Sequence, residues 1–274
     1  MSPSEPVRIT NPDDPRIALF REVKERDRVG REGVFIAEGQ SVLTVLLTRS
    51  PLDRLAILVD ERRADRLDVL AHRGATPLYV APQKVLNAIA GFDLHRGILA
   101  AGRIPPSAAL DGVGSGPLAL PVLVNLANHD NVGGIYRNAA AFGAAAVAID
   151  PTTADPFYRK AIRVGVGAPL FLPTIRTGDP VAFCAELAAH AIVPYALTPS
   201  ARRHVGAAPL APRAAFLLGT EGAGLPAPLL AAAEPLAIDI ASGFDSLNVA
   251  AASAIALHAH RLEHGGDRPL ADPS

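Results

Sequence analysis

The sequence has little cysteine and few aromatic residues. Cys184 is the one cysteine among 274 residues, tryptophan is absent, and aromatic residues make up 5%. A single cysteine excludes an internal disulfide bond, so we expect a reducing, cytoplasmic setting. Few aromatic side chains argue against a single-strand-binding protein that stacks bases on aromatic platforms. The first six residues lack the basic-then-apolar order of a signal peptide, and we expect none.

The sequence also lacks a charge excess and a long hydrophobic run. The net charge is −1, from 26 basic and 27 acidic residues, so the overall charge does not indicate a nucleic-acid partner. No run of 18 residues is free of glycine, proline and charge, so we expect no membrane-spanning segment. Hydrophobic residues make up 49% of the chain, which is enough for well-packed cores and excludes disorder as the main state.

A segment rich in proline, glycine and serine divides the chain. Residues 106–119 show no apolar period and are predicted to be a linker. Two domains, 1–105 and 120–264, are therefore expected, and residues 265–274 are predicted to be a tail.

Short apolar runs alternate with helical patterns on both sides of this linker, which is typical of α/β folds. Before it, the pattern predicts a small α/β sandwich with strands at 34–37, 55–59, 77–80 and 97–100 and helices at 39–48, 61–73 and 82–90. After it, continuous apolar runs predict a parallel sheet covered on both faces. Its strands are predicted at 121–125, 146–149, 191–197, 215–218 and 236–240, and its helices at 132–143, 180–190, 226–233 and 246–262.

Three loops beyond the carboxyl ends of these strands, where parallel sheets bind ligands, carry polar residues. In the first, Asn131 is a good helix N-cap, and Arg137 lies nearly two turns into an apolar helix. From the pattern alone, a cap with a surface arginine is favoured over a functional pair. In the second, glycines on both sides of Glu221 allow the backbone to approach a ligand closely, although Glu221 also suits a solvated turn. In the third, Ser246 can cap the last helix, and Asn248 follows on its first turn.

Together the three loops resemble the signature motifs of the SpoU (TrmH-like) RNA 2'-O-ribose methyltransferases, in the trefoil-knotted superfamily. The motifs are Asn-x-Gly-Gly-x-x-Arg-Asn at 131–138, Gly-Thr-Glu-Gly-x-Gly-Leu at 219–225 and Ser-Leu-Asn-Val at 246–249. The first 105 residues resemble the family's substrate-binding domain, which is of ribosomal-protein-L30 type. The family resemblance implies a C-terminal trefoil knot, a homodimer that packs through the knot and last helix, and active sites shaped by both subunits.

The resemblance implies S-adenosylmethionine as the cofactor and RNA, either rRNA or tRNA, as the substrate. The matching cofactor positions are Gly219, Gly222, Ile238, Leu247, Leu197 and Thr198. Arg137 matches the catalytic arginine, Asn131 and Asn248 match asparagines that orient it and the ribose, and Glu221 and Ser246 are expected to hold the arginine and the loop. Because arginine stays protonated, we expect Arg137 to bind phosphate and stabilise charge on the ribose oxygen.

Arg159, Lys160 and Arg163 form the one basic cluster with aromatic neighbours in the second half of the chain. They suit either a solvated helix face or a contact with RNA phosphates. His260 and His264 lie four positions apart on a predicted helix, a spacing that allows two histidines to share a metal ion. No third ligand accompanies them, so we expect no metal site. Two alternatives stay open, a non-catalytic RNA-binding protein on the same fold and a knotted methyltransferase that acts on a base.

Overall fold

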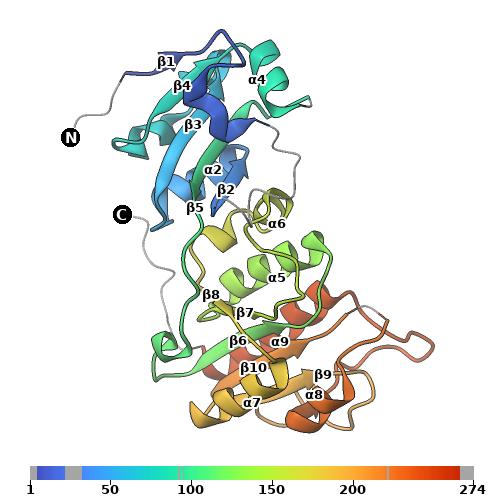
Figure 1. Ribbon diagram of the computed structural model, residues 1–274. Helices are drawn as coiled ribbons and strands as arrows, with labels where there is room; N and C mark the ends of the chain where they lie inside the picture. Colours follow the sequence, from blue (N-terminus) through green and yellow to red (C-terminus); the bar gives the residue numbers. More distant parts are fainter. Residues whose placement is uncertain (1–4, 22–32, 92, 95, 221, 266–274) are drawn as a thin grey trace. The chain divides into compact units, whose positions relative to one another are not determined.

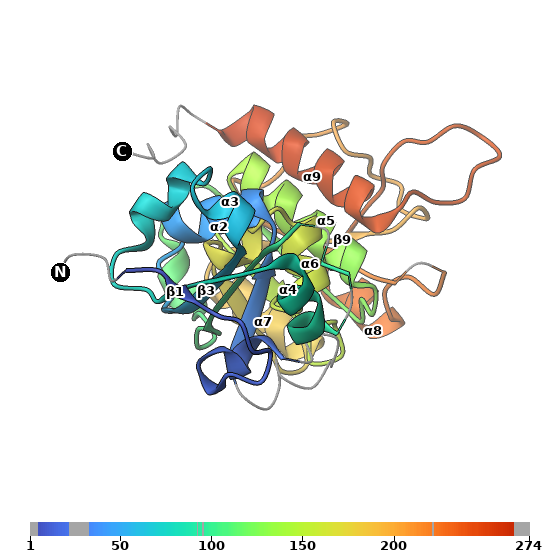
Figure 2. The ribbon, with the colours of Figure 1, turned by 90° about the horizontal axis from the view of Figure 1, so that it is seen from above.

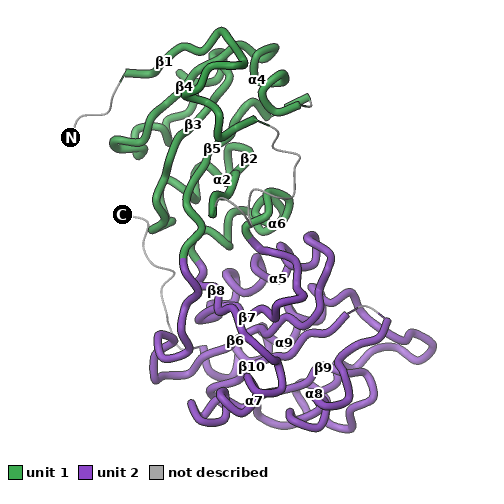
Figure 3. Tube along the Cα trace, in the orientation of Figure 1, with its two compact units in different colours: residues 1–105, 157–171, 273 green, residues 106–156, 172–272, 274 purple. Residues whose placement is uncertain are grey.

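A computed structural model describes residues 5–21, 33–91, 93–94, 96–220 and 222–265 (Figure 1). The chain divides into two compact units, coloured separately in Figure 3. The first unit contains residues 1–105 and also 157–171, and the second contains 106–156 and 172–272. The expected α/β fold class is confirmed, with a parallel sheet in the second half. Among the described residues, no helix has both the length and the apolar character needed to cross a bilayer.

The first unit is built around a five-stranded mixed sheet in the order β1-β4-β3-β5-β2. Strand β5 runs antiparallel to β2 and β3, and the other pairs are parallel. The strands are β1 (Val7–Arg8), β2 (Val34–Glu38), β3 (Arg54–Asp60), β4 (Leu78–Ala81) and β5 (Ile98–Arg103). The helices are η1 (Pro15–Phe20), α2 (Gln40–Thr48), α3 (Glu61–Ala64), η2 (Asp68–Arg73) and α4 (Gln83–Ala90), with α6 (Arg159–Val164) and η4 (Ala168–Leu170) from the later segment.

Both faces of this sheet are buried, because successive side chains of a strand point to opposite faces. On β2, Phe35 and Ala37 join one core, which is filled by α2 and by the later segment. Val34 and Ile36 join the other core, which is filled by η1 and α4. The prediction of a single helix at 61–73 is wrong, because α3 ends at Ala64 and a separate 3-10 helix, η2, begins at Asp68.

The second unit has a six-stranded parallel sheet in the order β11-β9-β10-β6-β7-β8. The strands are β6 (Leu118–Leu123), β7 (Val147–Ile149), β8 (Thr174–Arg176), β9 (Val193–Leu197), β10 (Arg213–Leu218) and β11 (Glu234–Leu236). The helices are η3 (Leu110–Val113), α5 (His129–Phe142), α7 (Pro180–Ala189), α8 (Ala227–Ala232) and α9 (Val249–His264). Strand β8 was absent from the sequence prediction.

Two helices cover each face of the parallel sheet. Side chains of α7 and α8 fill the core on one face, and α5 and α9 lie side by side on the other (Figures 1 and 2). The segment 106–119, expected to be a linker, includes η3 and the first residues of β6, and Leu110 is buried in this core. Strands β7 and β8 extend the sheet on one side of β6, and the chain then crosses to β9, β10 and β11 on the other side of β6. The direction in which strands are added therefore reverses between β6 and β10. Ligands of such sheets bind beyond the carboxyl ends of the strands near this switch point.

Candidate active site

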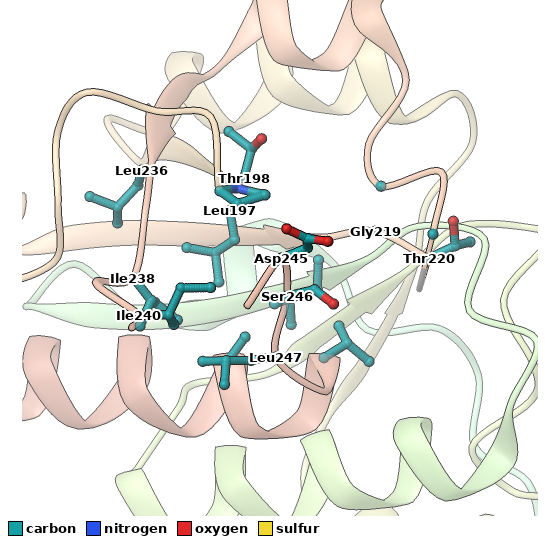
Figure 4. Close-up of a pocket in the computed structure, with 16 residues that line it drawn as sticks. Leu197, Thr198, Gly219, Thr220, Leu236, Ile238, Ile240, Asp245, Ser246 and Leu247 are labelled. Atoms are coloured by element: carbon teal, nitrogen blue, oxygen red, sulfur yellow. The ribbon is translucent and has the colours of Figure 1, made fainter. Parts of the chain in front are cut away.

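A cavity of about 330 Å³ lies beyond the carboxyl ends of β9, β10 and β11 (Figure 4). It lies within the second unit, and its walls come from the segments that follow these three strands and from the start of α9. The lining is mostly apolar, with a few hydroxyl groups and one carboxylate: Leu197, Thr198, Pro199, Leu218, Gly219, Thr220, Gly222, Gly224, Leu236, Ile238, Ile240, Asp245, Ser246, Leu247, Val249 and Ala252. Cavities with this balance of many apolar and few polar groups are typical of small-molecule sites.

The structure brings together all six positions expected to bind a cofactor. Gly219, Gly222, Ile238, Leu247, Leu197 and Thr198 all line the cavity. Sequence reasoning missed Ile240 and Asp245, which lie on the segment that leads from β11 to α9. The predicted bounds of the strand at 236–240 are wrong, because β11 ends at Leu236 and an irregular segment follows.

Gly219 is packed so tightly that only glycine fits. A Cβ atom there would lie 2.6 Å from the carbonyl carbon and oxygen of Gly224 and 2.7 Å from the amide nitrogen of Leu225. The loop closes on itself, since the Gly224 amide donates to the Thr220 carbonyl at 3.1 Å. Gly222 and Gly224 have φ values of 100° and 66°, which side chains rarely tolerate. The backbone itself therefore forms this wall of the cavity.

Two asparagines join the starts of α5 and α9. The Asn248 Nδ2 donates to the Asn131 Oδ1 at 3.0 Å, and the Asn248 Oδ1 accepts from the amides of Ala250 and Ala251. Two expected caps are therefore wrong. Asn128, not Asn131, caps α5, and Asn248, not Ser246, caps α9. Asn131 instead lies in the first turn of α5 and is buried, with 8% of the residue exposed.

Close contact between α5 and α9 fixes this pair of asparagines. A Cβ atom on Gly134 would lie 3.0 Å from the Ala250 Cβ, so the two helices approach closely there. One turn further along, the Asn138 Nδ2 donates to the Ala250 carbonyl at 2.7 Å and to the Ser253 Oγ at 3.0 Å. Sequence reasoning assigned Asn138 no role, although its place in the first motif was a signal.

Arg137 takes part in none of these contacts. Its side chain is exposed, it is not among the residues that line the cavity, and the described part of the chain offers it no hydrogen-bond or ion-pair partner. Ser246 lines the cavity beside Leu247, as Figure 4 shows. Glu221 lies outside the described residues. Within one chain, the structure therefore joins Asn131, in the first turn of α5, to Asn248, the N-cap of α9. It places Ser246 in the cavity lining and does not bring Arg137 into the cavity.

The basic cluster belongs to the first unit. Arg159 forms an ion pair with the buried carboxylate of Glu38, and the Arg163 Nη1 lies 3.9 Å from the same carboxylate. Lys160 is exposed on α6. Two of the three side chains thus neutralise a buried acid, and their Nη groups lie beside the carboxyl end of β2.

Burial keeps two titratable groups behind the site neutral. It raises the pKa of the Tyr136 phenol, which bonds the Thr174 hydroxyl at 2.7 Å. It also lowers the pKa of His260 on α9, whose Nε2 bonds the Pro212 carbonyl at 3.0 Å. Neither group is suited to carry a proton to the cavity, so both are structural.

Residues 120–258 match the model of the SpoU rRNA Methylase family. An uncharacterized tRNA/rRNA methyltransferase of Mycobacterium bovis is 36% identical over 261 residues, which cover 91% of this chain and 90% of that protein. A 23S rRNA guanosine 2'-O-methyltransferase of Bacillus subtilis is 32% identical over 129 residues, 47% of this chain and 52% of that protein. The crystal structure of an RNA 2'-O ribose methyltransferase superposes with a TM-score of 0.79 at 26% identity, covering 95% of this chain and all of the other.

Proposed function

The chain belongs to the SpoU rRNA methylase family, and we propose that it methylates the 2'-hydroxyl of a ribose in rRNA or tRNA with S-adenosylmethionine as the methyl donor. The hydrogen bond between Asn131 and Asn248 beside the glycine-walled cavity carries this proposal. This hydrogen bond joins the motif at 131–138 to the motif at 246–249, beside the cavity wall that the glycine-rich motif at 219–225 forms. The names of the B. subtilis relative and of the superposed structure, both 2'-O-methyltransferases, support ribose as the target.

The cavity suits this cofactor. Leu197, Ile238 and Leu247 provide apolar walls for a flat base, and Gly219 leaves the backbone free to contact it. S-adenosylmethionine supplies an electrophilic methyl group on a positively charged sulfur. The chain supplies no cation among the described lining residues, so nothing there opposes a positively charged donor.

The asparagines and Ser246 position the acceptor. A ribose hydroxyl is a poor nucleophile, so its placement in line with the methyl group supplies much of the rate. Asn248 is held by the amides that it caps and by Asn131, so its amide group has one fixed orientation, and its two neighbours, Leu247 and Val249, line the cavity. We assign the pair to orienting the ribose, and Ser246 and Glu221 to holding the loop and the arginine.

Arg137 acts on the RNA rather than on the cofactor. An arginine guanidinium binds phosphate in a bidentate manner, so we expect Arg137 to stabilise negative charge on the ribose oxygen as the hydroxyl proton leaves to phosphate or water. Since Arg137 lies outside the cavity of its own chain, we place it at the active site of the partner in a homodimer.

The outer face of α9 supports this homodimer. Ile255 and Leu262 are two turns apart and are 40% and 74% exposed. Exposed apolar side chains on one stripe of a helix are typical of a subunit interface. Sedimentation should show a dimer that Leu262→Asp converts to monomer; a monomeric wild-type protein would contradict this arrangement.

The first unit is assigned to recognition of the RNA. We expect Lys160, exposed on α6, and the partly exposed Arg159 and Arg163 to contact RNA phosphates, because basic side chains bind the negatively charged backbone. The trefoil knot implied by the motifs stays a prediction.

The test is a methyl-transfer assay with the purified protein, unmodified rRNA and tRNA transcripts, and S-adenosylmethionine labelled in its methyl group. A 2'-O-methyl group removes the nucleophile of alkaline hydrolysis, so the label should remain in alkali-resistant dinucleotides. Label in mononucleotides would show base methylation, and no incorporation with any RNA would favour a non-catalytic RNA-binding protein.

A further inference from the structure

Asp245 is the one charged residue among the described residues that line the cavity. It precedes Ser246 on the segment that leads into α9, and the other described lining residues are apolar, glycine, proline or hydroxyl-bearing. Its carboxylate points from this segment into the space between Thr198 and Gly219, as Figure 4 shows. A ligand that fills the cavity therefore meets one negative charge.

No described side chain neutralises this charge. Asp245 makes no ion pair or hydrogen bond with any part of the chain that the structure describes, although the segment contains other polar residues. Asp239 lies between the lining residues Ile238 and Ile240 but is not part of the lining, and its side chain is 91% exposed. Asp245 thus differs from Asp239, because Asp245 lines the cavity and Asp239 does not.

The charge of the ligand changes during the proposed reaction. The donor has a sulfonium, an ammonium and a carboxylate group and a net charge of +1, whereas the demethylated product, S-adenosylhomocysteine, has a neutral thioether and a net charge of zero. A carboxylate in the cavity attracts the donor more strongly than the product, because the Coulomb energy depends on the ligand charge.

We propose that Asp245 is a specificity-determining residue that makes the cavity prefer the positively charged donor over its neutral product. This inference rests on the proposed function. Its consequence is that the site releases the product more readily once the positive charge on sulfur is lost. The apolar walls contact both ligands alike and cannot supply this preference.

The test is isothermal titration of the full-length protein with S-adenosylmethionine, S-adenosylhomocysteine and sinefungin, an unreactive analogue in which a cationic amine replaces the sulfonium methyl group. In Asp245→Asn the affinities for S-adenosylmethionine and sinefungin should fall by about three- to tenfold, the size expected for one partly solvated charge pair. The affinity for S-adenosylhomocysteine should change less than twofold. The matched control, Asp239→Asn, removes an equal charge outside the cavity and should leave all three affinities unchanged.

An equal loss for all three ligands in Asp245→Asn would overturn the inference, because it would show a contact with a part that they share. Unchanged affinities would overturn it as well. Either result leaves the proposed function intact, provided that the wild-type protein binds S-adenosylmethionine. A wild-type protein that binds none of the ligands would refute the proposed function itself.

Discussion

Gly219→Ala changes the candidate cofactor site by one methyl group, and its effect follows from the geometry of the glycine-rich loop. The new Cβ atom would lie 2.6 Å from backbone atoms of Gly224, whereas ordinary contacts begin at 3.4 Å. The loop must therefore retreat by about 0.8 Å. Because the obstructing atoms are backbone atoms, no change of side-chain rotamer relieves the contact. Gly219 does not have a positive φ, so the whole effect is steric.

Overpacking of this kind costs about 1–3 kcal/mol. The cost is divided between folding and binding, depending on how far the loop moves when the cavity is empty. Each 1 kcal/mol that remains in the folded protein lowers the melting temperature by about 2–4 °C in a protein of this size. Each 1.4 kcal/mol that appears on ligand binding weakens S-adenosylmethionine about tenfold.

Calorimetric titration and thermal melting of the same samples measure the two parts. We expect Gly219→Ala to bind S-adenosylmethionine at least fivefold more weakly or to melt several degrees lower, with the summed cost in the range given above. Gly178→Ala is the matched control in the same unit, because a Cβ atom there meets nothing within 4 Å. A Gly219→Ala protein with wild-type affinity and melting temperature would refute the assignment of this loop as a wall of the cofactor site.

Three further predictions concern other parts of the chain. Arg137→Ala should keep the wild-type affinity for S-adenosylmethionine but lower the single-turnover methylation rate by ~10²–10³, the size found for one lost oxyanion donor; Arg137→Lys should recover little, and a normal rate with weaker RNA binding would contradict this role. Residues 1–105 alone should not unfold cooperatively, because the segment 157–171 supplies three fully buried apolar side chains worth about 5–9 kcal/mol, and tethering 157–171 to them should restore a sigmoidal melt; a cooperative melt of 1–105 alone would disprove this. Because burial lowers the folded-state pKa of His260 below 6.5, the unfolded chain binds more protons, so stability present above pH 6.5 should fall as the pH drops towards 5.5; His260→Gln should lose less over this range, and equal slopes of melting temperature against pH would count against it.

Most strands were predictable because they are continuous apolar runs that both faces of a sheet bury. Strand β8 was missed because it is three residues long, and its ends, Thr174 and Arg176, are polar. Its Thr174 is buried through the hydrogen bond to Tyr136, a contact between distant parts of the chain. The place of residues 157–171 in the first unit is also a tertiary effect, since their apolar pattern fits a core in either unit.

Three residues of the cavity lining, Gly219, Gly222 and Leu247, were predictable from the family motifs, whereas the helix caps were not predictable from local sequence. Asn128, Asp130 and Asn131 are all good cap residues within four positions, and so are Ser246 and Asn248 two residues apart. The hydrogen bond between Asn131 and Asn248 determines how these side chains are used, and it joins residues 117 positions apart. For this reason the chemistry of the loops could be inferred from sequence, but the atoms that hold them could not.

The central claim is that the methyl group is placed on a ribose, and the RNA of the organism tests it most directly. Nucleoside mass spectrometry and alkaline-hydrolysis mapping should compare rRNA and tRNA from the parent strain and from a strain that lacks this gene. We expect the loss of a 2'-O-methylated nucleotide in the deletion strain and its return with the wild-type gene but not with Arg137→Ala. The loss of a base methylation with every 2'-O-methyl group retained would contradict it.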